Sequence, residues 1–470
     1  MKKKILILIS IVTIISLMFM VGCTNKDFNV QKTDQIDVSA LANEYIELLA
    51  TAYPDRTSGT GREDSVMKFI SSQMQTYGYE PNGSYELNNS IIQGANRYTY
   101  YNGINDLEGA GYGFNLIFDK KAEGKSKGTI ILSTQYDNLY SFPKVPTKAD
   151  GTYESGASTA MLLTISSLLK ENTFPFDLKI IYYGGGSYNW EGARAYLSTM
   201  TQPEIDNILL SIDLGQIIYG DANYVYTVDK STSYGNLINE IIEVNQLNFD
   251  KVPSYKRVAN AKLIEEGLYN YFHAGMLSNN IFMLNRGIPT LNIMTHNASD
   301  ISNPLKTEAK GRENFYQTGA DNLENLKTLY SQEIVNSRIN SIANLVVDML
   351  TGENQAKMVS ALSTAREELP SKMAQSDMTG MILGIALKMV LIIALIVTMI
   401  QMRKIVTNKQ DYYKQMLNKP IQNVNQKPID VFGWDSENKK DVNSEDGEII
   451  EGEIIEPDDK DDNDDIFSDL

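Results

Sequence analysis

The segment DLKIIYYGGGSYNWEGARAYL, residues 177–197, joins a short apolar run to a helical pattern through a glycine loop. Residues 177–183 are apolar and aromatic between polar neighbours, which predicts a buried strand. The loop Gly184–Ser187 follows at once. Such loops commonly form active sites, so this one could hold a phosphate, serve as a catalytic turn, or have lost its chemistry. No lysine follows in the Walker pattern, which disfavours the phosphate.

Apolar runs and helical patterns alternate on both sides of this loop. Strands are predicted at 128–134, 177–183, 207–214 and 289–294, and helices at 63–77, 158–169 and 325–350. This alternation predicts an α/β fold with a mostly parallel central sheet flanked by helices. Ligands of such sheets bind beyond the carboxyl ends of the strands, so functional residues are expected there.

Composition divides the whole chain into six expected segments. They are a signal peptide with a lipobox or a signal anchor (1–23), a linker (24–37), one extracellular domain (38–352), a juxtamembrane segment (353–380), a transmembrane helix (381–401) and an acidic, disordered cytoplasmic tail (402–470).

The N-terminal segment has the layout of an export signal. Three lysines precede an apolar stretch that ends at Cys23, the one cysteine of the chain. The ending resembles a bacterial lipobox, although Met20 stands where leucine is expected. Lipidation of Cys23 is therefore expected, and an uncleaved signal anchor is the alternative.

The second apolar stretch, 381–401, is long enough to cross a bilayer. Arg403, Lys404 and Lys409 follow it, which predicts a cytoplasmic C-terminal side and an ectodomain outside a bacterial cell membrane. Lys388 lies within the stretch. It either snorkels to the interface or pairs with an acidic group on a partner helix.

The tail carries most of the chain's negative charge. Residues 430–470 hold 17 acidic residues and three lysines, a net of −14, against −17 for the whole chain. Such a segment is expected to be disordered, with a docking peptide built on the isoleucine pairs at 449–450 and 454–455 as the alternative. No basic, aromatic pattern suggests nucleic-acid binding.

Seven segments, from about residue 53 to residue 352, resemble peptidase family M28, the exported di-zinc aminopeptidases and glutamate carboxypeptidases. The quoted loop resembles the family's F-F-D-G-E-E segment and the helix after it. The other segments include GTIILSTQYDN (128–138), ESGASTAMLLTISSLL (154–169), ILLSIDLGQI (208–217), RGIPTLNI (286–293) and YQTGADNLENL (316–326).

The resemblance implies two zinc ions held by two histidines and three carboxylates, with a separate glutamate as the general base. The five ligand positions are occupied here by Gln135, Gly151, Ser187, Asp213 and Gln317, and the base position by Gly186. Asp150 takes the bridging position if the alignment slips by one residue. Asp137 matches an aspartate of the family that supports the metal ligands without binding zinc itself. At most two ligands, Asp213 and Asp150, remain.

These replacements predict that the chain has no catalytic residue and holds no zinc. Glu191 lies close to the loop, but it is expected to lie already in the following helix. His273 and His296 fall at no ligand position and are expected to be ordinary surface or loop residues. Asp213 and Asp137 are expected to cap turns or accept backbone N–H bonds rather than bind metal.

The expected function is that of a membrane-anchored extracytoplasmic pseudo-peptidase, which binds or scaffolds a peptide or protein partner at the cell envelope. One alternative is an active zinc aminopeptidase with an unusual or single-metal site that uses Asp150, Asp213 and Glu191. The other is a structural subunit of a membrane complex.

Overall fold

The computed structural model describes residues 28–87, 90–101, 110–139, 149–187, 190–227, 232–250, 278–296 and 319–417. The chain divides into two compact units, Met1–Met378 and Thr379–Leu470. Cys23, His273, Gln317 and the tail after residue 417 lie outside the described residues, as do the side chains of His296 and of most of 381–394.

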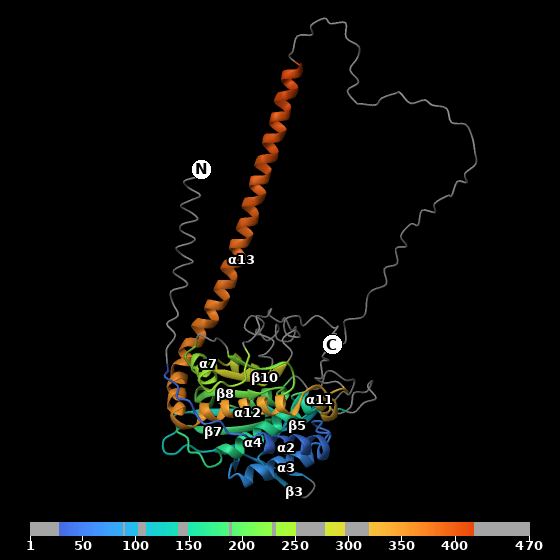
Figure 1. Cartoon of the computed structure of the whole chain (residues 1–470), viewed down its shortest axis with the longest axis vertical. Coiled ribbons are helices and arrows are strands. Elements are labelled where there is room, and N and C mark those ends of the chain that lie inside the picture. Colours follow the sequence, from blue (N-terminus) through green and yellow to red (C-terminus); the bar gives the residue numbers. More distant parts are fainter. Residues whose placement is uncertain are drawn as a thin grey trace, which may run out of the picture. The chain divides into compact units, whose positions relative to one another are not determined.

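An eight-stranded sheet forms the centre of the first unit (Figure 1). Its order is β1-β5-β7-β6-β8-β10-β9, and β4 pairs with β5. The strands are β1 (Glu80–Pro81), β4 (Ala95–Tyr101), β5 (Ala110–Lys120), β6 (Thr129–Gln135), β7 (Asp177–Tyr183), β8 (Ile208–Leu214), β9 (Ala222–Thr227) and β10 (Thr290–His296).

The four central strands, β7, β6, β8 and β10, run parallel to one another. They are the four strands that the sequence predicts, so the mostly parallel centre of the sheet is confirmed. Strands β1, β4, β5 and β9 are antiparallel additions at the two ends. A separate hairpin joins β2 (Ser84–Leu87) to β3 (Ser90–Gln93).

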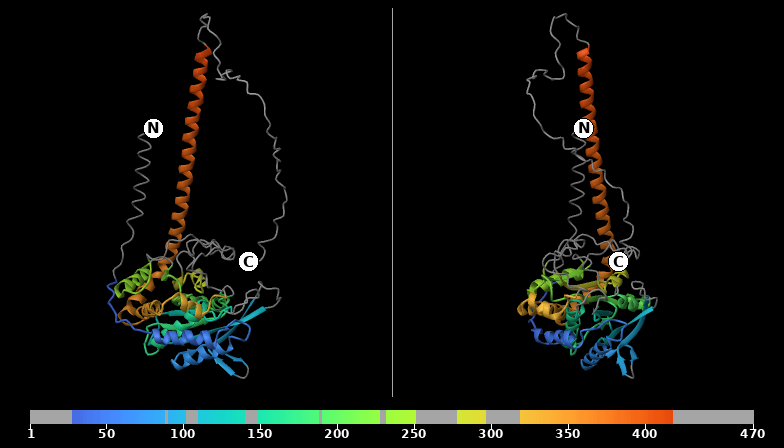
Figure 2. Two further views of the ribbon diagram at one scale, coloured as in Figure 1. Left: turned by 45° about the vertical axis from the view of Figure 1, so that its right-hand side comes forward. Right: turned by 90° about the vertical axis from the view of Figure 1, so that its right-hand side faces the viewer.

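Helices cover both faces of the sheet (Figure 2). The larger core contains residues of α2 (Ser39–Ala52), α3 (Asp64–Thr76), α4 (Ala157–Leu169), α7 (Ser233–Asn245) and α12 (Gln332–Leu350). The smaller core contains residues of α5 (Glu191–Ser198), α6 (Gln202–Asp206) and α9 (Ile281–Asn285). A π-helical turn, η1 (Thr152–Gly156), leads into α4.

The prediction of a single closing helix at 325–350 is wrong in one detail. The structure has two helices there, α11 (Leu323–Leu329) and α12. The break occurs at Ser331, whose hydroxyl oxygen accepts the Ile334 N–H and caps a new helix.

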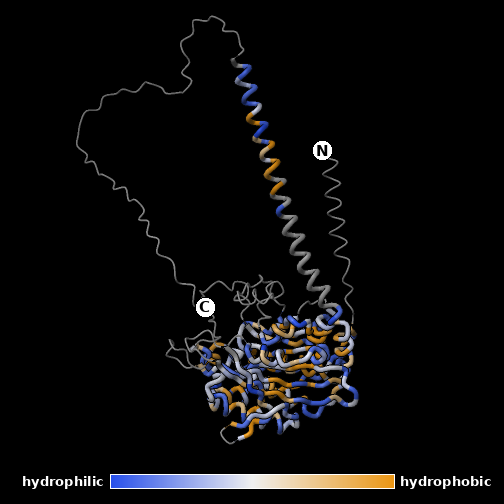
Figure 3. Tube along the Cα trace, turned by 180° about the vertical axis from the view of Figure 1, so that it is seen from behind, coloured by the Kyte–Doolittle hydropathy of each residue, from blue (hydrophilic) through white to orange (hydrophobic). Residues whose placement is uncertain are grey.

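The last helix, α13 (Gly352–Leu417), begins in the first unit, where Met358, Leu362 and Ala365 are buried. In the second unit it continues without a break from Thr379 to Leu417 and becomes more hydrophilic toward its C-terminal end (Figure 3). Over the described residues, no helix is long and apolar enough to cross a membrane. Most side chains of 381–394 are not among those residues, so the span at 381–401 stays a prediction.

Candidate functional site

Three loops meet beyond the carboxyl ends of β6 and β7, where the parallel sheet was expected to place functional residues. Asp137 connects two of them. Its carboxylate accepts the Gly186 N–H at 2.9 Å and the Ser187 N–H at 3.4 Å. Burial, and after it the nearby Glu154 carboxylate, raise the pKa of Asp137 to about 7. The Asp137 side chain thus holds the glycine loop in place by accepting hydrogen bonds from the backbone of the loop.

Glu154, on the turn η1, is a buried carboxylate that sequence reasoning missed. Its Oε1 accepts the Ser187 hydroxyl at 2.7 Å, and its Oε2 accepts the Leu139 N–H at 3.1 Å. Ser187, which the sequence resemblance predicts at the position of a zinc-binding glutamate, directs its hydroxyl to Glu154. The available signal was a charged residue at the head of the otherwise uncharged segment 154–169.

Asp321 is the second carboxylate that was missed, although it lies in the quoted YQTGADNLENL segment. It accepts the Tyr153 N–H at 2.7 Å and the Glu154 N–H at 2.9 Å. Burial raises its pKa to about 8. Asp150 accepts the Thr152 N–H at 3.0 Å and the Leu323 N–H at 2.9 Å. Both aspartates therefore act as caps for neighbouring backbone.

Arg56 is a fully buried cation among these acids. Its guanidinium donates to the carbonyl oxygens of Tyr136 at 2.9 Å and Asp150 at 3.0 Å. It also donates to the Gly151 carbonyl at 3.1 Å and the Ser155 hydroxyl at 2.9 Å. Burial lowers the pKa of Arg56, and the surrounding carboxylates oppose that shift. The arginine joins the loops through neutral oxygens and balances part of their acidic charge.

The three glycines of the loop have no room for a side chain. A Cβ at Gly186 would lie 2.6 Å from Gln135 Cδ and 2.7 Å from Gln135 Cβ. A Cβ at Gly185 would collide with the Tyr98 hydroxyl, and one at Gly184 with the Phe114 carbonyl. The triple glycine is therefore required by close packing on three sides.

The backbone N–H groups of the loop are also occupied. Gly184 donates to Asn115 Oδ1 at 3.2 Å, and Gly185 donates to Ser58 Oγ at 2.9 Å. Gly186 and Ser187 donate to Asp137. Because each donor already has an internal acceptor, the loop does not present a cradle of free N–H groups to a phosphate.

The remaining described ligand positions have similar internal partners. Gln135 is buried and donates to the Asp137 carbonyl at 3.2 Å. Asp213 accepts the Ser133 hydroxyl at 2.9 Å and the Asn279 amide at 3.1 Å, and burial raises its pKa to about 6. Glu191 begins α5, as expected, and its carboxylate lies 3.8 Å from Arg194 Nε.

The described residues do not fit a zinc pair. Neutral imidazole and free carboxylates suit zinc, whereas the described ligand positions offer one glycine, an amide, a hydroxyl and a carboxylate that accepts hydrogen bonds from Ser133 and Asn279. Among the described residues, no group of three or more His, Cys, Asp or Glu side chains could hold a metal ion.

Buried acids with raised pKa values predict an unusual pH dependence of stability. Glu63 is fully buried; its Oε1 accepts the Gly59 N–H at 2.6 Å, whereas its Oε2 has no hydrogen-bond partner among the described residues. Burial raises the Glu63 pKa to about 7, so the folded state binds this proton more tightly than the unfolded state. The resulting stability is present below about pH 4 and is lost as the pH rises through about 7.

We expect the free energy of unfolding, measured in urea, to fall between about pH 5 and about pH 8. Glu63→Gln keeps the shape of the side chain but removes its titration. Over this pH range the free energy of unfolding of Glu63→Gln should fall less than that of the wild type, and the difference should be on the order of 2 kcal/mol. Glu80→Gln, at an exposed site, is the control and should follow the wild type. If the free energy of unfolding changed equally with pH in the wild type and in Glu63→Gln, the prediction would be contradicted.

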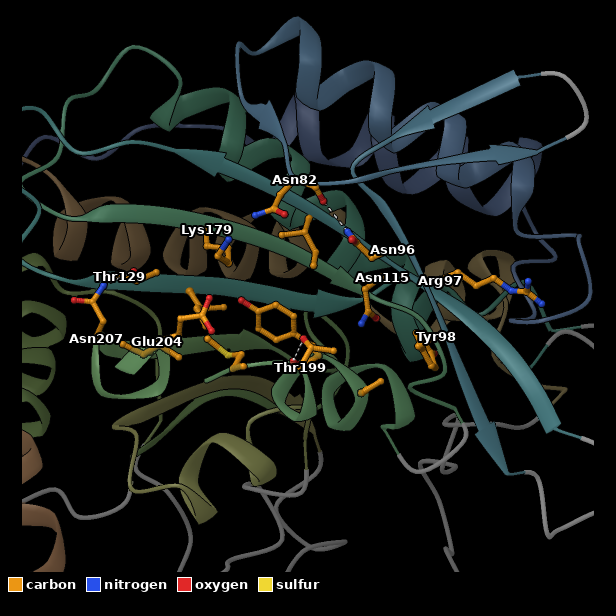
Figure 4. Close-up of a pocket in the computed structure, with 16 residues that line it drawn as sticks. Asn82, Asn96, Arg97, Tyr98, Asn115, Thr129, Lys179, Thr199, Glu204 and Asn207 are labelled. Carbon is orange, nitrogen blue, oxygen red and sulfur yellow. Dashed lines mark hydrogen bonds between the residues drawn. The ribbon is translucent and has the colours of Figure 1, made fainter. Parts of the chain in front are cut away.

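A separate hollow of about 390 Å³ lies on the face of the sheet beside α5 and α6 (Figure 4). Its lining is rich in amides and includes Asn82, Asn96, Asn115, Asn207, Lys179 and Tyr196. Asn115 also donates to the Gly192 carbonyl at 2.8 Å while accepting from Gly184, so it ties the hollow to the glycine loop. Gln135, Gly151, Gly186, Ser187 and Asp213, the ligand and base positions that the structure describes, do not line this hollow.

Comparison with known proteins gives one family match. The model of "Peptidase family M28" matches residues 115–342. The alkaline phosphatase isozyme conversion protein of Escherichia coli (strain K12) is 25% identical over 192 residues, which is 39% of this chain and 52% of the relative. The chain thus matches about half the length of that curated relative.

Solved structures with a similar fold share little sequence with this chain. A zinc aminopeptidase from Bacillus subtilis is 13% identical, with 67% of this chain and 95% of that chain covered and a TM-score of 0.47. A glutaminyl cyclase from Porphyromonas gingivalis is 14% identical, with 67% and 99% covered and a TM-score of 0.46.

Proposed function

Because residues 115–342 belong to peptidase family M28, we propose that the chain keeps the family's fold as a pseudo-peptidase whose zinc ligands and general base are largely lost. The supporting observation is that the groups at the described ligand positions have internal hydrogen-bond partners. Ser187 donates to Glu154, Gln135 donates to the Asp137 carbonyl, and Asp213 accepts from Ser133 and Asn279. At Gly186 there is neither a side chain nor space for one.

Loss of the base alone would cost on the order of 10²–10⁴-fold in rate, because a positioned carboxylate contributes that much to proton transfer. Without zinc there is also no water activated near neutral pH. What the fold keeps is a rigid, hydrogen-bonded edge of the sheet. We propose that it binds or scaffolds a peptide or protein partner at the cell envelope.

The proposal includes membrane attachment, which rests on sequence. The basic and apolar start that ends at Cys23, and the apolar stretch 381–401, support an anchored ectodomain outside a bacterial cell with the tail in the cytoplasm. A structural subunit of a membrane complex remains the alternative, in which Lys388 contacts an acidic group of a partner helix.

The working-enzyme alternative is tested on the full-length chain in detergent. After incubation with zinc and dialysis, we expect metal well below one ion per chain, no rise in Tm with added zinc, and no hydrolysis of aminoacyl-anilides. Since a ligand that binds only the folded state raises stability, a true site would raise Tm.

Asp213→Asn is the matched variant for this test, because it keeps the side-chain shape at the one outright ligand match. Stoichiometric zinc together with turnover that disappears in Asp213→Asn would replace the proposal by the active single-metal enzyme. We expect the wild type and Asp213→Asn to give the same zinc content and the same aminoacyl-anilide hydrolysis, both at background level.

A further inference from the structure

The helical segment that follows the predicted span has an apolar face with nothing packed against it among the described residues. Met402, Ile405, Val406, Tyr412 and Tyr413 of α13 are each more than half exposed. At 100° per residue they lie within one arc of the helix, so they form a single stripe. Exposed apolar stripes of this kind mark interaction surfaces.

Basic residues interrupt and border this stripe. Lys409 falls in the middle of the arc, and Arg403 and Lys414 lie along one side of it. Residues 402–417 contain four basic residues and one acidic residue, a net charge of +3. We call the stripe together with Lys409, Arg403 and Lys414 the basic-apolar face. A fitting partner carries apolar side chains framed by carboxylates.

The chain's own tail has this composition. Residues 445–465 carry twelve acidic residues and one lysine, a net charge of −11. Within them, the repeat GEIIEGEIIE places two pairs of isoleucines between glutamates. Both the charge and the apolar content therefore complement the basic-apolar face.

The tail also lies within reach of this face. Residues 418–444 connect the two, and a flexible tether of this length spans roughly 30 Å on average. The helix 402–417 is itself about 24 Å long. Residues 418–470 contain no apolar run long enough to cross a bilayer, so tail and helix share one compartment. A short tether gives the tail a local concentration in the millimolar range.

We propose that residues 445–465 dock on the basic-apolar face of α13 within the same chain. Docking covers the exposed stripe, neutralises Lys409 and its neighbours, and makes the face unavailable to other acidic partners until the tail is displaced. This inference concerns the second unit alone and holds whether or not the ectodomain is a pseudo-peptidase.

The test measures the distance between two spin labels in the full-length chain in nanodiscs of neutral lipid. The labels are attached at Thr407→Cys, off the docking stripe, and at Gly452→Cys, in a Cys23→Ser background. Docking predicts a population near 20 Å, whereas a free tail gives a broad distribution near or above 35 Å. About 0.5 M NaCl should reduce the short population severalfold, because it screens exposed charges.

Two matched pairs of charge reversals test whether the tail docks specifically on the basic-apolar face. Lys409→Glu with Lys414→Glu should remove the short population, whereas Lys419→Glu with Lys427→Glu, of equal net charge change, should retain it. A broad distribution in the parent chain overturns the proposal. The proposal is also overturned if the short distance survives Lys409→Glu with Lys414→Glu, or if both pairs of charge reversals abolish it equally. A short distance that vanishes on dilution with unlabelled chain would be intermolecular and would overturn it as well.

Discussion

Arg56→Leu is expected to destabilise the folded domain by about 3–5 kcal/mol, since removing one member of a buried charged network leaves its partners uncompensated. Leucine has no donors for the carbonyl oxygens of Tyr136, Asp150 and Gly151, which Arg56 now satisfies. It also removes the positive charge that faces Asp137, Glu154, Asp150 and Asp321. Urea unfolding of the full-length chain in detergent, followed by tryptophan fluorescence, measures the change.

Arg62→Leu is the matched control. Arg62 forms an exposed ion pair with Asp55 at 2.7 Å, and such pairs contribute less than about 1 kcal/mol. Arg56→Lys should resemble Arg56→Leu more than the wild type, because an ammonium cannot reach the five oxygens to which the planar guanidinium donates. Equal stability of Arg56→Leu and Arg62→Leu would show that the buried arginine does not organise the loops.

The same cluster shows how far sequence alone reaches. The four parallel strands were predictable because each is a short, buried apolar run between polar residues. The outer strands were not. The core-facing residues of β5 alternate with small and polar ones such as Gly113 and Asn115, and β4 carries Asn96 and Arg97 before its tyrosines. Neither pattern stands out as a continuous apolar run.

The sequence predicted where the site lies in the fold better than it predicted which groups its residues contact. The loops after β6 and β7 meet as expected, and Asp137 accepts backbone N–H groups there. Glu154 and Asp321 were missed because their role depends on groups far away in sequence. Glu154 accepts the hydroxyl of Ser187, 33 positions on, and Asp321 accepts the N–H of Tyr153, 168 positions back. No local pattern reports such a contact. The reason for the triple glycine was also hidden, since Gln135 and Tyr98 fill the space from other strands.

Gly186→Glu places a glutamate where the sequence resemblance predicts the general base. It is expected to lower stability by at least about 3 kcal/mol and to produce no peptidase activity. The new Cβ would lie 2.7 Å from Gln135 Cβ, which belongs to a central strand and cannot rotate away. The carboxylate would also enter a region where Asp137 and Glu154 are already buried close together. Thermal and urea unfolding, together with an aminoacyl-anilide assay with added zinc, measure both consequences.

Gly186→Ala separates the steric part from the charge and should cost about 1–3 kcal/mol. Gly215→Ala, at the carboxyl end of β8, is the matched control, because its Cβ would meet the flexible side chain of Met294 at 3.0 Å. Gln135→Ala should recover part of the Gly186→Ala loss, since it removes the contact at 2.6 Å and leaves the one at 2.7 Å. If Gly186→Glu instead folds like the wild type and gains zinc-dependent turnover, the loop lacks only its acid. The close packing around the three glycines would then not be what excludes catalysis.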